Sequence, residues 1–289
     1  MGRAVRARPG ATVWLLVVAL LGIVAWAAPS ASGAYLARIT NSTDTAATAP
    51  YFQCSAALAQ DSSSALFQWP LSDAPGSTTV SDISGSSHPG IYQGTTTTDS
   101  TAPLACPRDA SHDGGTSWSL DGSTESAYYG VKQTNPQIFT IEVWFRTTSP
   151  QGKLIDYAAT QAGGGAQYDR QLYVDRNGRV EFGIYSGATH TVIAPAVVTD
   201  GAWHQAAATL SSAGMALYLD GRLVASDSTQ TAAEAFNGYW RVGYDNINGA
   251  WPNYPVSGYF KGRLRYAAVY TTALTATQIA NHWGAGSGT

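Results

Sequence analysis

The chain has 289 residues, of which 44% are hydrophobic and 12% are charged. Its 9 Trp, 16 Tyr and 7 Phe supply large side chains for burial, which excludes a chain that is disordered throughout. The 16 basic residues are outnumbered by 19 acidic ones and form no run outside the first eight positions, so the electrostatic footprint of a nucleic-acid-binding protein is missing.

The N-terminus has the three-part layout of an export signal. Three arginines within the first eight residues precede a mostly apolar, uncharged run at 11–28, and the small residues of 29–34 follow. We predict a signal at 1–33 that is cleaved after Gly33, and therefore a secreted or cell-surface protein. The alternative is an uncleaved anchor with the domain outside the cell, because an 18-residue run just reaches the lower limit for spanning a bilayer.

Cys54 and Cys106 are the only cysteines, and an even number fits an oxidising compartment. We predict that they form one disulfide, which would close a loop of roughly fifty residues and stabilise the fold by about 4 kcal/mol on the chain-entropy model. The alternative is a pair of buried free thiols. A zinc site is not predicted, because no His stands near either cysteine at metal-ligand spacing.

The composition changes at Ala65. Residues 34–64 are rich in Ala, Thr and Ser, which predicts an extended lead-in with one strand at 35–40. From Ala65 onward, short segments rich in Val, Ile, Tyr, Phe and Trp alternate with Gly, Asp, Asn and Ser, as is typical of a strand-and-turn protein. We therefore place one domain at 65–284 and a flexible tail at 285–289.

Alternation with a period of two identifies single strands. In 139–147 the hydrophobic residues Phe139, Ile141, Val143 and Phe145 share one face, which predicts a half-buried central strand. Two-residue turns then predict two consecutive hairpins with type I′ turns, because Asn-Gly and Asp-Gly tolerate positive φ angles. The predicted hairpins are 171–174 with 180–185 through Asn177-Gly178, and 215–219 with 222–226 through Asp220-Gly221.

One helix is predicted, near the C-terminus, after a long strand at 258–270. Thr275 and Gln278 have the spacing of a capping box, and Ile279 and Trp283 fall on one face that can pack on a sheet. Gly284 and Gly286 should end the helix. Because strands and helices do not alternate along the chain, a parallel sheet is excluded, and we predict an all-β sandwich of antiparallel sheets with one short C-terminal helix.

Seven segments, in this order, resemble the laminin G-like family of concanavalin A-like jelly rolls, of the bacterial secreted type. They are WPLSDAPGSTTVSDISG (69–85), SLDGSTESAYY (119–129), FTIEVWFRT (139–147), LYVDRNGRVEFGI (172–184), DGAWHQAAATL (200–210), MALYLDGRLVAS (215–226) and YFKGRLRYAAVYTTALTATQIANHW (259–283). The resemblance implies two antiparallel sheets packed face to face. It also implies a module that holds glycans, proteins or neighbouring domains and is not itself an enzyme.

Many members of this family hold one calcium ion through a loop carboxylate, loop carbonyls and an Asp of the last long strand. Asp82 matches the loop carboxylate. Arg265 stands where relatives carry an acidic residue, and a cation there would repel a divalent ion or pair with Asp82 instead. We therefore predict no metal and no other cofactor, with Asp82 acting as a turn-forming residue.

The carboxylates do not suggest catalysis. Cleavage of a glycosidic bond needs two carboxylates facing one site, and the strand with Glu142 offers only Trp144 and Arg146 beside it. Nucleophile-elbow, H-E-x-x-H and phosphate-loop motifs are missing from the sequence. His204 is interpreted as a hydrogen-bonded residue at a sheet edge. We predict no enzyme and no catalytic residue; the alternative is a polysaccharide hydrolase with carboxylates from separate strands.

The best candidate for ligand contact is the loop at 243–259. Tyr244, Trp251, Tyr254 and Tyr259 lie there among Asn, Gly and Pro, a composition that places aromatic rings on irregular backbone near solvent. These rings could stack on sugars, or they could pack the loop onto the sandwich.

The sequence thus favours an extracellular, non-catalytic binding or adhesion module that contacts glycans or a cell-surface protein. The alternative within this class is a structural spacer in a cell-envelope matrix or filament. No nucleic-acid partner is expected. Contact with a membrane is expected only through the N-terminal apolar segment, if it stays attached.

Overall fold

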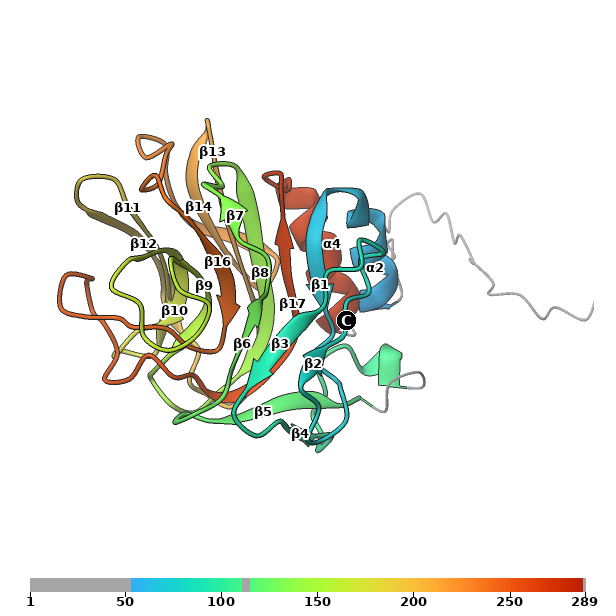
Figure 1. Ribbon diagram of the computed structural model, residues 1–289. Helices are drawn as coiled ribbons and strands as arrows, with labels where there is room; N and C mark the ends of the chain where they lie inside the picture. The colour runs from blue at the N-terminus through green and yellow to red at the C-terminus, as the bar shows by residue number, and fades with distance from the viewer. Residues whose placement is uncertain (1–52, 111–114, 288–289) are drawn as a thin grey trace, which may run out of the picture. The chain divides into compact units, whose positions relative to one another are not determined.

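Strands dominate the residues that the computed structural model describes, which are 53–110 and 115–287. They form two antiparallel sheets, one of 8 and one of 9 strands, that pack face to face (Figure 1). Two helices, α2 (Cys54–Gln60) and α4 (Ala276–Ser287), contact each other outside the 8-stranded sheet. The predicted sandwich of antiparallel sheets with a C-terminal helix is confirmed.

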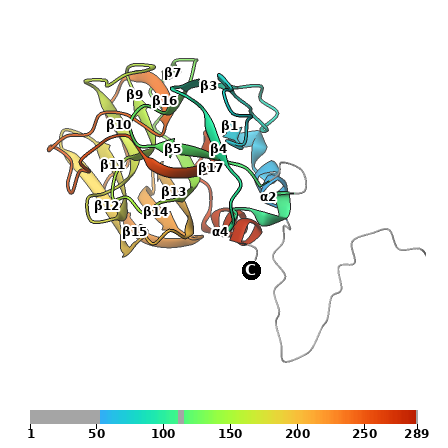
Figure 2. The same ribbon diagram turned by 90° about the horizontal axis from the view of Figure 1, so that it is seen from below.

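The 8-stranded sheet, sheet A, consists of β1 (Ala65–Trp69), β4 (Thr97–Asp99), β5 (Ser117–Asp121), β8 (Phe139–Arg146), β13 (Trp203–Ser211), β14 (Gly214–Leu219), β15 (Arg222–Asp227) and β17 (Lys261–Tyr270). Its order is β15-β14-β13-β8-β17-β5-β4, and β1 also pairs with β17. Figure 2 shows β4, β5 and β17 side by side.

The 9-stranded sheet, sheet B, consists of β2 (Thr79–Val80), β3 (Gly90–Gln93), β6 (Ser126–Tyr129), β7 (Gln133–Thr134), β9 (Lys153–Ala158), β10 (Tyr168–Val174), β11 (Arg179–Tyr185), β12 (Thr189–Val197) and β16 (Asn237–Val242). Its order is β12-β11-β10-β9-β16-β6-β3-β2, and β7 pairs with β16. Two 3₁₀ turns, Ser62–Ser64 and Pro107–Asp109, complete the structure.

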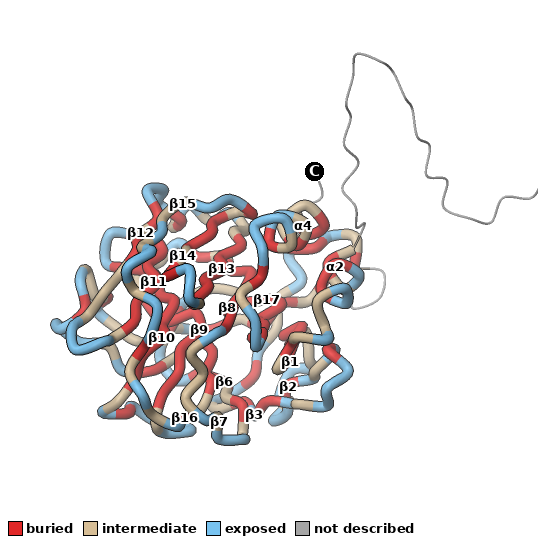
Figure 3. Tube along the Cα trace, turned by 90° about the horizontal axis from the view of Figure 1, so that it is seen from above, coloured by how far each residue is buried: buried red, intermediate tan, exposed pale blue. Residues whose placement is uncertain are grey.

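The main core lies between the sheets and is built by alternate side chains, as the period of two predicts. Strand β8 contributes Phe139, Ile141, Val143 and Phe145, and β11 contributes Val180, Phe182 and Ile184. In Figure 3, buried residues run through the middle of both sheets, and exposed ones gather in the loops and at the edge strands β12 and β15.

The opposite face of β8 is buried as well, which corrects the prediction of a half-buried strand. Glu142 and Trp144 are 0% and 2% exposed because α4 lies over them. Trp283 of α4 stacks on Trp144 with ring centroids 5.0 Å apart, and His282 Nδ1 lies 2.8 Å from Glu142 Oε2. Gly286 permits this approach, since a Cβ there would lie 2.1 Å from the Trp144 ring.

Helix α4 begins as predicted and ends later than predicted. The Thr275 N–H donates to Gln278 Oε1 at 2.8 Å, and the Gln278 N–H donates to Thr275 Oγ1 at 3.3 Å, which completes the capping box. The helix continues through Gly284 to Ser287, so the expected flexible tail at 285–289 is wrong for its first residues. Close packing against sheet A overrides the low helix propensity of glycine here.

The lead-in at 34–64 ends in a helix where an extended chain was expected. Helix α2 buries Ala57 and Leu58, and Leu58 packs in one cluster with residues of α4 and sheet A. Seven residues are too few for a stable isolated helix, so tertiary contacts hold it. Among these contacts is the predicted disulfide, since Cys54 and Cys106 are bonded.

The two predicted hairpins are present with the expected pairing, but their turns differ. Asp220 and Gly221 both have positive φ, at 53° and 73°, as a type I′ turn requires. In the other turn only Gly178 has positive φ, at 75°, because the Asp175 carboxylate accepts the Asn177 and Arg179 N–H groups and sets a different conformation. The type I′ prediction for that turn is therefore wrong.

The predicted export signal at 1–33 and the predicted strand at 35–40 lie outside the described residues. Whether the signal is cleaved or retained as an anchor therefore stays a prediction. Within 53–110 and 115–287, no helix is long and apolar enough to cross a membrane.

We expect removal of the disulfide to destabilise the fold by about 4 kcal/mol on the chain-entropy model. The bond links residues 52 positions apart and fastens α2 to the turn before β5. The double variant Cys54→Ser/Cys106→Ser avoids a leftover thiol, and urea unfolding measures the loss. Wild-type chain treated with reductant should match the variant, and an unchanged urea midpoint in both would contradict the prediction.

Candidate functional site

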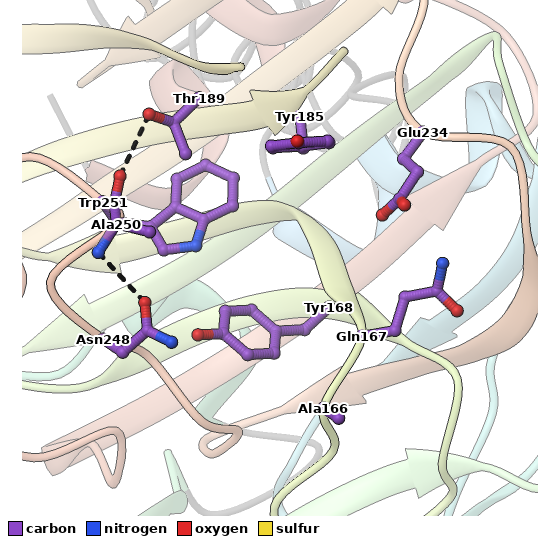
Figure 4. A pocket seen from close by; sticks show the side chains of 9 residues that line it. All are labelled: Ala166, Gln167, Tyr168, Tyr185, Thr189, Glu234, Asn248, Ala250 and Trp251. Atoms are coloured by element: carbon purple, nitrogen blue, oxygen red, sulfur yellow. Dashed lines mark hydrogen bonds between the residues drawn. The ribbon is translucent and has the colours of Figure 1, made fainter. Parts of the chain in front are cut away.

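A pocket of about 380 Å³ opens beside sheet B, where β10, the start of β12 and the loop 243–259 meet (Figure 4). The side chains around it come from four separate segments. They are Gln167, Tyr168, Tyr185, Thr189, Glu234, Asn248 and Trp251, with Ala166 and Ala250 completing the wall.

The pocket has an aromatic side and a polar side. Figure 4 shows the rings of Tyr168, Tyr185 and Trp251 around one part of the space, and the Glu234 carboxylate and the Gln167 amide around the other. Tyr185, Glu234 and Gln167 are partly exposed, so a ligand can reach them. This arrangement can take a molecule that presents an apolar face and a row of hydroxyl groups.

A single buried carboxylate, that of Asp169, holds the two sides in place. Its Oδ1 accepts the Tyr185 N–H at 2.7 Å, and its Oδ2 accepts the Glu234 N–H at 2.9 Å. The Arg170 guanidinium lies 3.3 Å from the same Oδ2 and donates to the Glu234 carbonyl at 2.8 Å. The end of β11 and the loop before β16 are therefore positioned from one point.

This anchor depends on an irregular backbone. Arg170 has a positive φ of 48°, and the pairing of β9 with β10 shifts between Asp169 and Leu172, which marks a β-bulge. The Asp169 and Arg170 side chains are both 0% exposed. Burial raises the pKa of Asp169, and the neighbouring Arg170 and three backbone N–H groups oppose that rise.

A second set of buried charges fixes the loop 243–259 at its start. Asp245 lies 3.1 Å from Arg241 and accepts the Gly165 N–H at 3.2 Å. Lys153 and Asp156, also 0% exposed, lie 3.7 Å apart, and both Lys153 and Asp156 interact electrostatically with Asp245. Asp245 thus joins the loop 243–259 to the segment that contains Gly165, and both contribute lining residues to the pocket.

The aromatic residues that the sequence singled out have different positions. Trp251 lines the pocket but is only 4% exposed, and a Cβ at Gly183 would lie 2.6 Å from its ring. Tyr244 and Tyr259 stack on each other with ring centroids 3.6 Å apart. The Tyr254 ring lies under the Arg176 guanidinium at 4.2 Å.

The middle of the loop is fastened to β10 and β11. The Tyr173 hydroxyl donates to Glu181 Oε2 at 2.5 Å and lies 3.0 Å from the Pro252 carbonyl. The Asn253 amide donates to Glu181 Oε1 at 2.8 Å. These contacts therefore favour the second use considered for the loop aromatics, which is packing the loop onto the sandwich rather than stacking on sugars.

Sequence reasoning found Trp251 and missed Tyr168, Tyr185 and Glu234. The two tyrosines could have been found from the register of the β10–β11 hairpin. Gln171 lies opposite Gly183, so Tyr168 and Tyr185 both fall at the end of the hairpin away from its turn. Glu234 has no such signal. It reaches the pocket through bonds of its backbone to Asp169 and Arg170, which are 65 and 64 positions away in the sequence.

The residues weighed for calcium have other partners. Asp82 stabilises a turn, as predicted. Its carboxylate accepts hydrogen bonds from the backbone N–H groups of Gln68, Ser84 and His88. Arg265 is buried and donates to the Ala105 carbonyl at 3.0 Å. Among the described residues, no three or more His, Cys, Asp or Glu side chains gather in a way that could hold a metal ion.

His204 is hydrogen-bonded, as interpreted, but not at a sheet edge. Its Nδ1 lies 2.9 Å from Asp220 and its Nε2 lies 3.2 Å from Asp200. Strand β13, which it begins, is paired on both sides. Burial alone would lower the pKa of His204, and the two carboxylates outweigh this effect and raise it.

Several solved structures have the same fold. Domain 4 of AbnA, an extracellular arabinanase from Geobacillus stearothermophilus, aligns over 75% of this chain and 97% of its own, with 14% identity and a TM-score of 0.53. A structure of botulinum neurotoxin type C aligns over 77% of this chain and 51% of its own, with 13% identity and a TM-score of 0.52. The binding domain of Paraclostridial Mosquitocidal Protein 1 aligns over 76% of this chain and 51% of its own, with 13% identity and a TM-score of 0.51.

At the level of sequence, no curated protein matches this chain. Residues 121–280, more than half of the chain, match the Laminin_G_3 family model, described as the concanavalin A-like lectin/glucanases superfamily. This range runs from the end of β5 into α4 and includes every lining residue of the pocket. The chain therefore belongs to the laminin G branch of the concanavalin A-like lectin/glucanase superfamily.

Proposed function

We propose that this chain is an extracellular, non-catalytic glycan-binding domain and that it holds a sugar in the pocket between Tyr185 and Glu234. The observation that carries the proposal is the division of this pocket into an aromatic and a polar side. A pyranose or furanose ring has an apolar C–H face that packs on aromatic rings. Its hydroxyl groups bond to carboxylates and amides, which fix its orientation.

The structural neighbours support a glycan as the ligand class. The arabinanase domain was solved in complex with arabinotriose, and the neurotoxin structure concerns an interaction with two ganglioside molecules. These likenesses are of fold, at 13–14% identity. The ligand of this chain is therefore argued from its own pocket.

The positions of the carboxylates support binding without cleavage. Glu234 is the one carboxylate among the residues that line the pocket. Hydrolysis of a glycosidic bond needs an acid and a second carboxylate that acts as nucleophile or base. Of the other glutamates, Glu142 is buried under α4 and Glu181 is buried under the loop 243–259.

An extracellular location is supported by two features. The Cys54–Cys106 disulfide fits an oxidising compartment. The N-terminal 33 residues have the layout of an export signal.

We expect Tyr185→Ala and Glu234→Gln each to weaken glycan binding about tenfold, since each removes a contact on one side of the pocket. A glycan array on the secreted chain identifies the ligand, and calorimetry measures the affinities. Tyr128→Ala, a partly exposed tyrosine outside the pocket, is the matched control and should bind as wild type. Trp251→Ala is unsuitable, because that side chain is buried and supports the loop.

Two results would contradict the proposal. If the secreted chain binds no glycan, the structural spacer is favoured. If it releases reducing sugar from a polysaccharide and Glu234→Gln abolishes that release, the chain is a hydrolase.

A further inference from the structure

A second cavity, of about 270 Å³, lies at the end of β8 beside the start of β17 and shares no lining residue with the pocket described above. Three cationic side chains line it, those of Arg146, Lys261 and Arg263. Hydroxyl-bearing residues lie next to them, including Ser119 and Thr148. The formal charge of the whole chain is −3, so the local charge here is opposite to that of the protein.

Two of these cations are direct neighbours across strands. Arg146 on β8 stands opposite Arg263 on β17 in the antiparallel register. Like charges directly opposite each other destabilise a sheet unless counter-charges compensate them. The compensation visible in the structure is partial.

Arg263 is compensated within the chain. Its NH2 is ion-paired with the Asp99 carboxylate, and its NH1 donates to the Thr101 carbonyl at 2.8 Å. Asp99 is thus engaged with Arg263 and with the Thr101 N–H. The three cations therefore share one closely paired carboxylate, which forms its ion pair with Arg263 and interacts with Arg146 at longer range.

Arg146 and Lys261 form no ion pair within 4.0 Å with a described carboxylate, although Asp99 also interacts electrostatically with Arg146. The Arg146 Nε donates to the Gly201 carbonyl, and its NH1 is buried without a hydrogen-bond partner. Lys261 is exposed and lines the cavity. Buried polar groups normally find a partner, so this guanidinium nitrogen can donate a hydrogen bond to an anion that enters the cavity.

The nearby carboxylates of Asp121 and Asp200 form hydrogen bonds to other groups and no ion pair within 4.0 Å with Arg146 or Lys261. Asp121, opposite Lys261 in the register, accepts the Ser123 N–H at 2.7 Å. Asp200 accepts the Ala202 N–H at 2.8 Å and contacts His204 at 3.2 Å.

We propose that this cavity binds a carboxylate or sulfate group of an acidic polysaccharide. An oxyanion placed between the two guanidinium groups and the Lys261 ammonium would compensate the facing arginines, and such charge-assisted bonds are stronger than neutral ones. The hydroxyls of Ser119 and Thr148 would bond to sugar hydroxyls beside the anionic group. This site is independent of the sugar pocket at Tyr185.

The test measures binding of the full secreted chain to three polymers at low salt: polygalacturonate, dextran sulfate and uncharged dextran. We expect Lys261→Gln to weaken binding to an acidic polymer about fivefold to tenfold, since it removes one charged contact. Lys132→Gln is the matched control, because it deletes the same charge from an exposed lysine that lies over the Tyr239 ring. Arg146→Gln should act like Lys261→Gln, with circular dichroism to verify its fold.

The two acidic polymers distinguish a carboxylate from a sulfate, and both support the proposal. It is overturned if wild type binds neither acidic polymer more tightly than dextran, or if Lys132→Gln weakens binding as much as Lys261→Gln. Binding of the array-identified glycan should be unchanged in Lys261→Gln, so failure of this site and failure of the sugar pocket give different results.

Discussion

Asp169→Ala is expected to lower the free energy of unfolding by about 3–5 kcal/mol, the range for removing one partner of a buried ion pair. The substitution leaves the Arg170 guanidinium, which is 0% exposed, without its counter-ion. It also removes the acceptor for the backbone N–H groups of Tyr185 and Glu234. Urea unfolding of the secreted chain measures the change.

Two further variants make this prediction specific. Asp169→Asn keeps an acceptor oxygen but loses the charge, so its destabilisation should be smaller than that of Asp169→Ala. Asp227→Ala is the control, since that partly exposed carboxylate accepts its side-chain hydrogen bonds only from Thr229. Its urea midpoint should stay close to that of wild type. An equal loss of stability in Asp169→Ala and Asp227→Ala would contradict the role given to the Asp169 carboxylate.

The variant Asp169→Asn should also weaken glycan binding, because the bonds of Asp169 hold the two sides of the sugar pocket. Tyr185 and Glu234 are held by one carboxylate, so a folded Asp169→Asn chain should bind glycan more weakly than wild type while binding acidic polysaccharide normally. Calorimetry under conditions where the variant is still folded checks this. Unchanged glycan affinity would show that the Asp169 bonds do not position the pocket.

His282 should make the stability of the protein fall as the pH rises from about 6.5 to about 10. The side chain lies between Glu142 at 2.8 Å and Asp61 at 3.0 Å. Burial alone would lower the pKa of His282, but these two carboxylates raise it from 6.5 to about 10. The folded state therefore binds the proton more tightly than the unfolded state, and its stabilisation is fully present below pH 6.5 and is lost above pH 10.

The difference between wild type and His282→Gln should therefore shrink with pH. The contribution of the proton is on the order of 5 kcal/mol at low pH. Urea unfolding at several pH values from 6 to 10.5 measures it, and tyrosine and lysine titration cancels in the comparison. His190→Gln is the control, because His190 lies on β12 and has no contact with His282, Glu142 or Asp61. Its stability should follow the wild-type pH profile. Parallel curves for wild type and His282→Gln would contradict the prediction.

Much of the fold was predictable because its signals are local. Alternation in 139–147 and the Gly-containing turns at 177–178 and 220–221 identified strands and hairpins that the structure confirms. The capping box at Thr275 was equally local. Such features depend on residues within a few positions of one another, so the sequence carries them directly.

The errors arose where distant residues decide the outcome. Strand β8 has two buried faces because His282 and Trp283 come to lie over Glu142 and Trp144. Helix α2 forms although seven residues make a poor helix, because α4 and the Cys54–Cys106 bond hold it. Nothing within 54–60 indicates these partners.

The candidate site divides in the same way. Trp251 was visible in the sequence as an aromatic residue in a long polar loop, and it lines the pocket. That it is buried, and that Tyr185 and Glu234 offer the accessible surface instead, follows from the bulge at Arg170 and from the bonds of Asp169.

By itself, the sequence indicated an antiparallel sandwich and a disulfide, because the period of two, the turn residues and the even number of cysteines can be identified without knowing which segments meet. Only the tertiary structure decided which polar side chains meet. The Tyr185–Glu234 pocket and the Arg146–Arg263 pair each depend on strand register and on chain segments tens of residues apart. The physical reason is burial: a charge removed from water is costly unless it is paired, and the fold decides which segment supplies the partner.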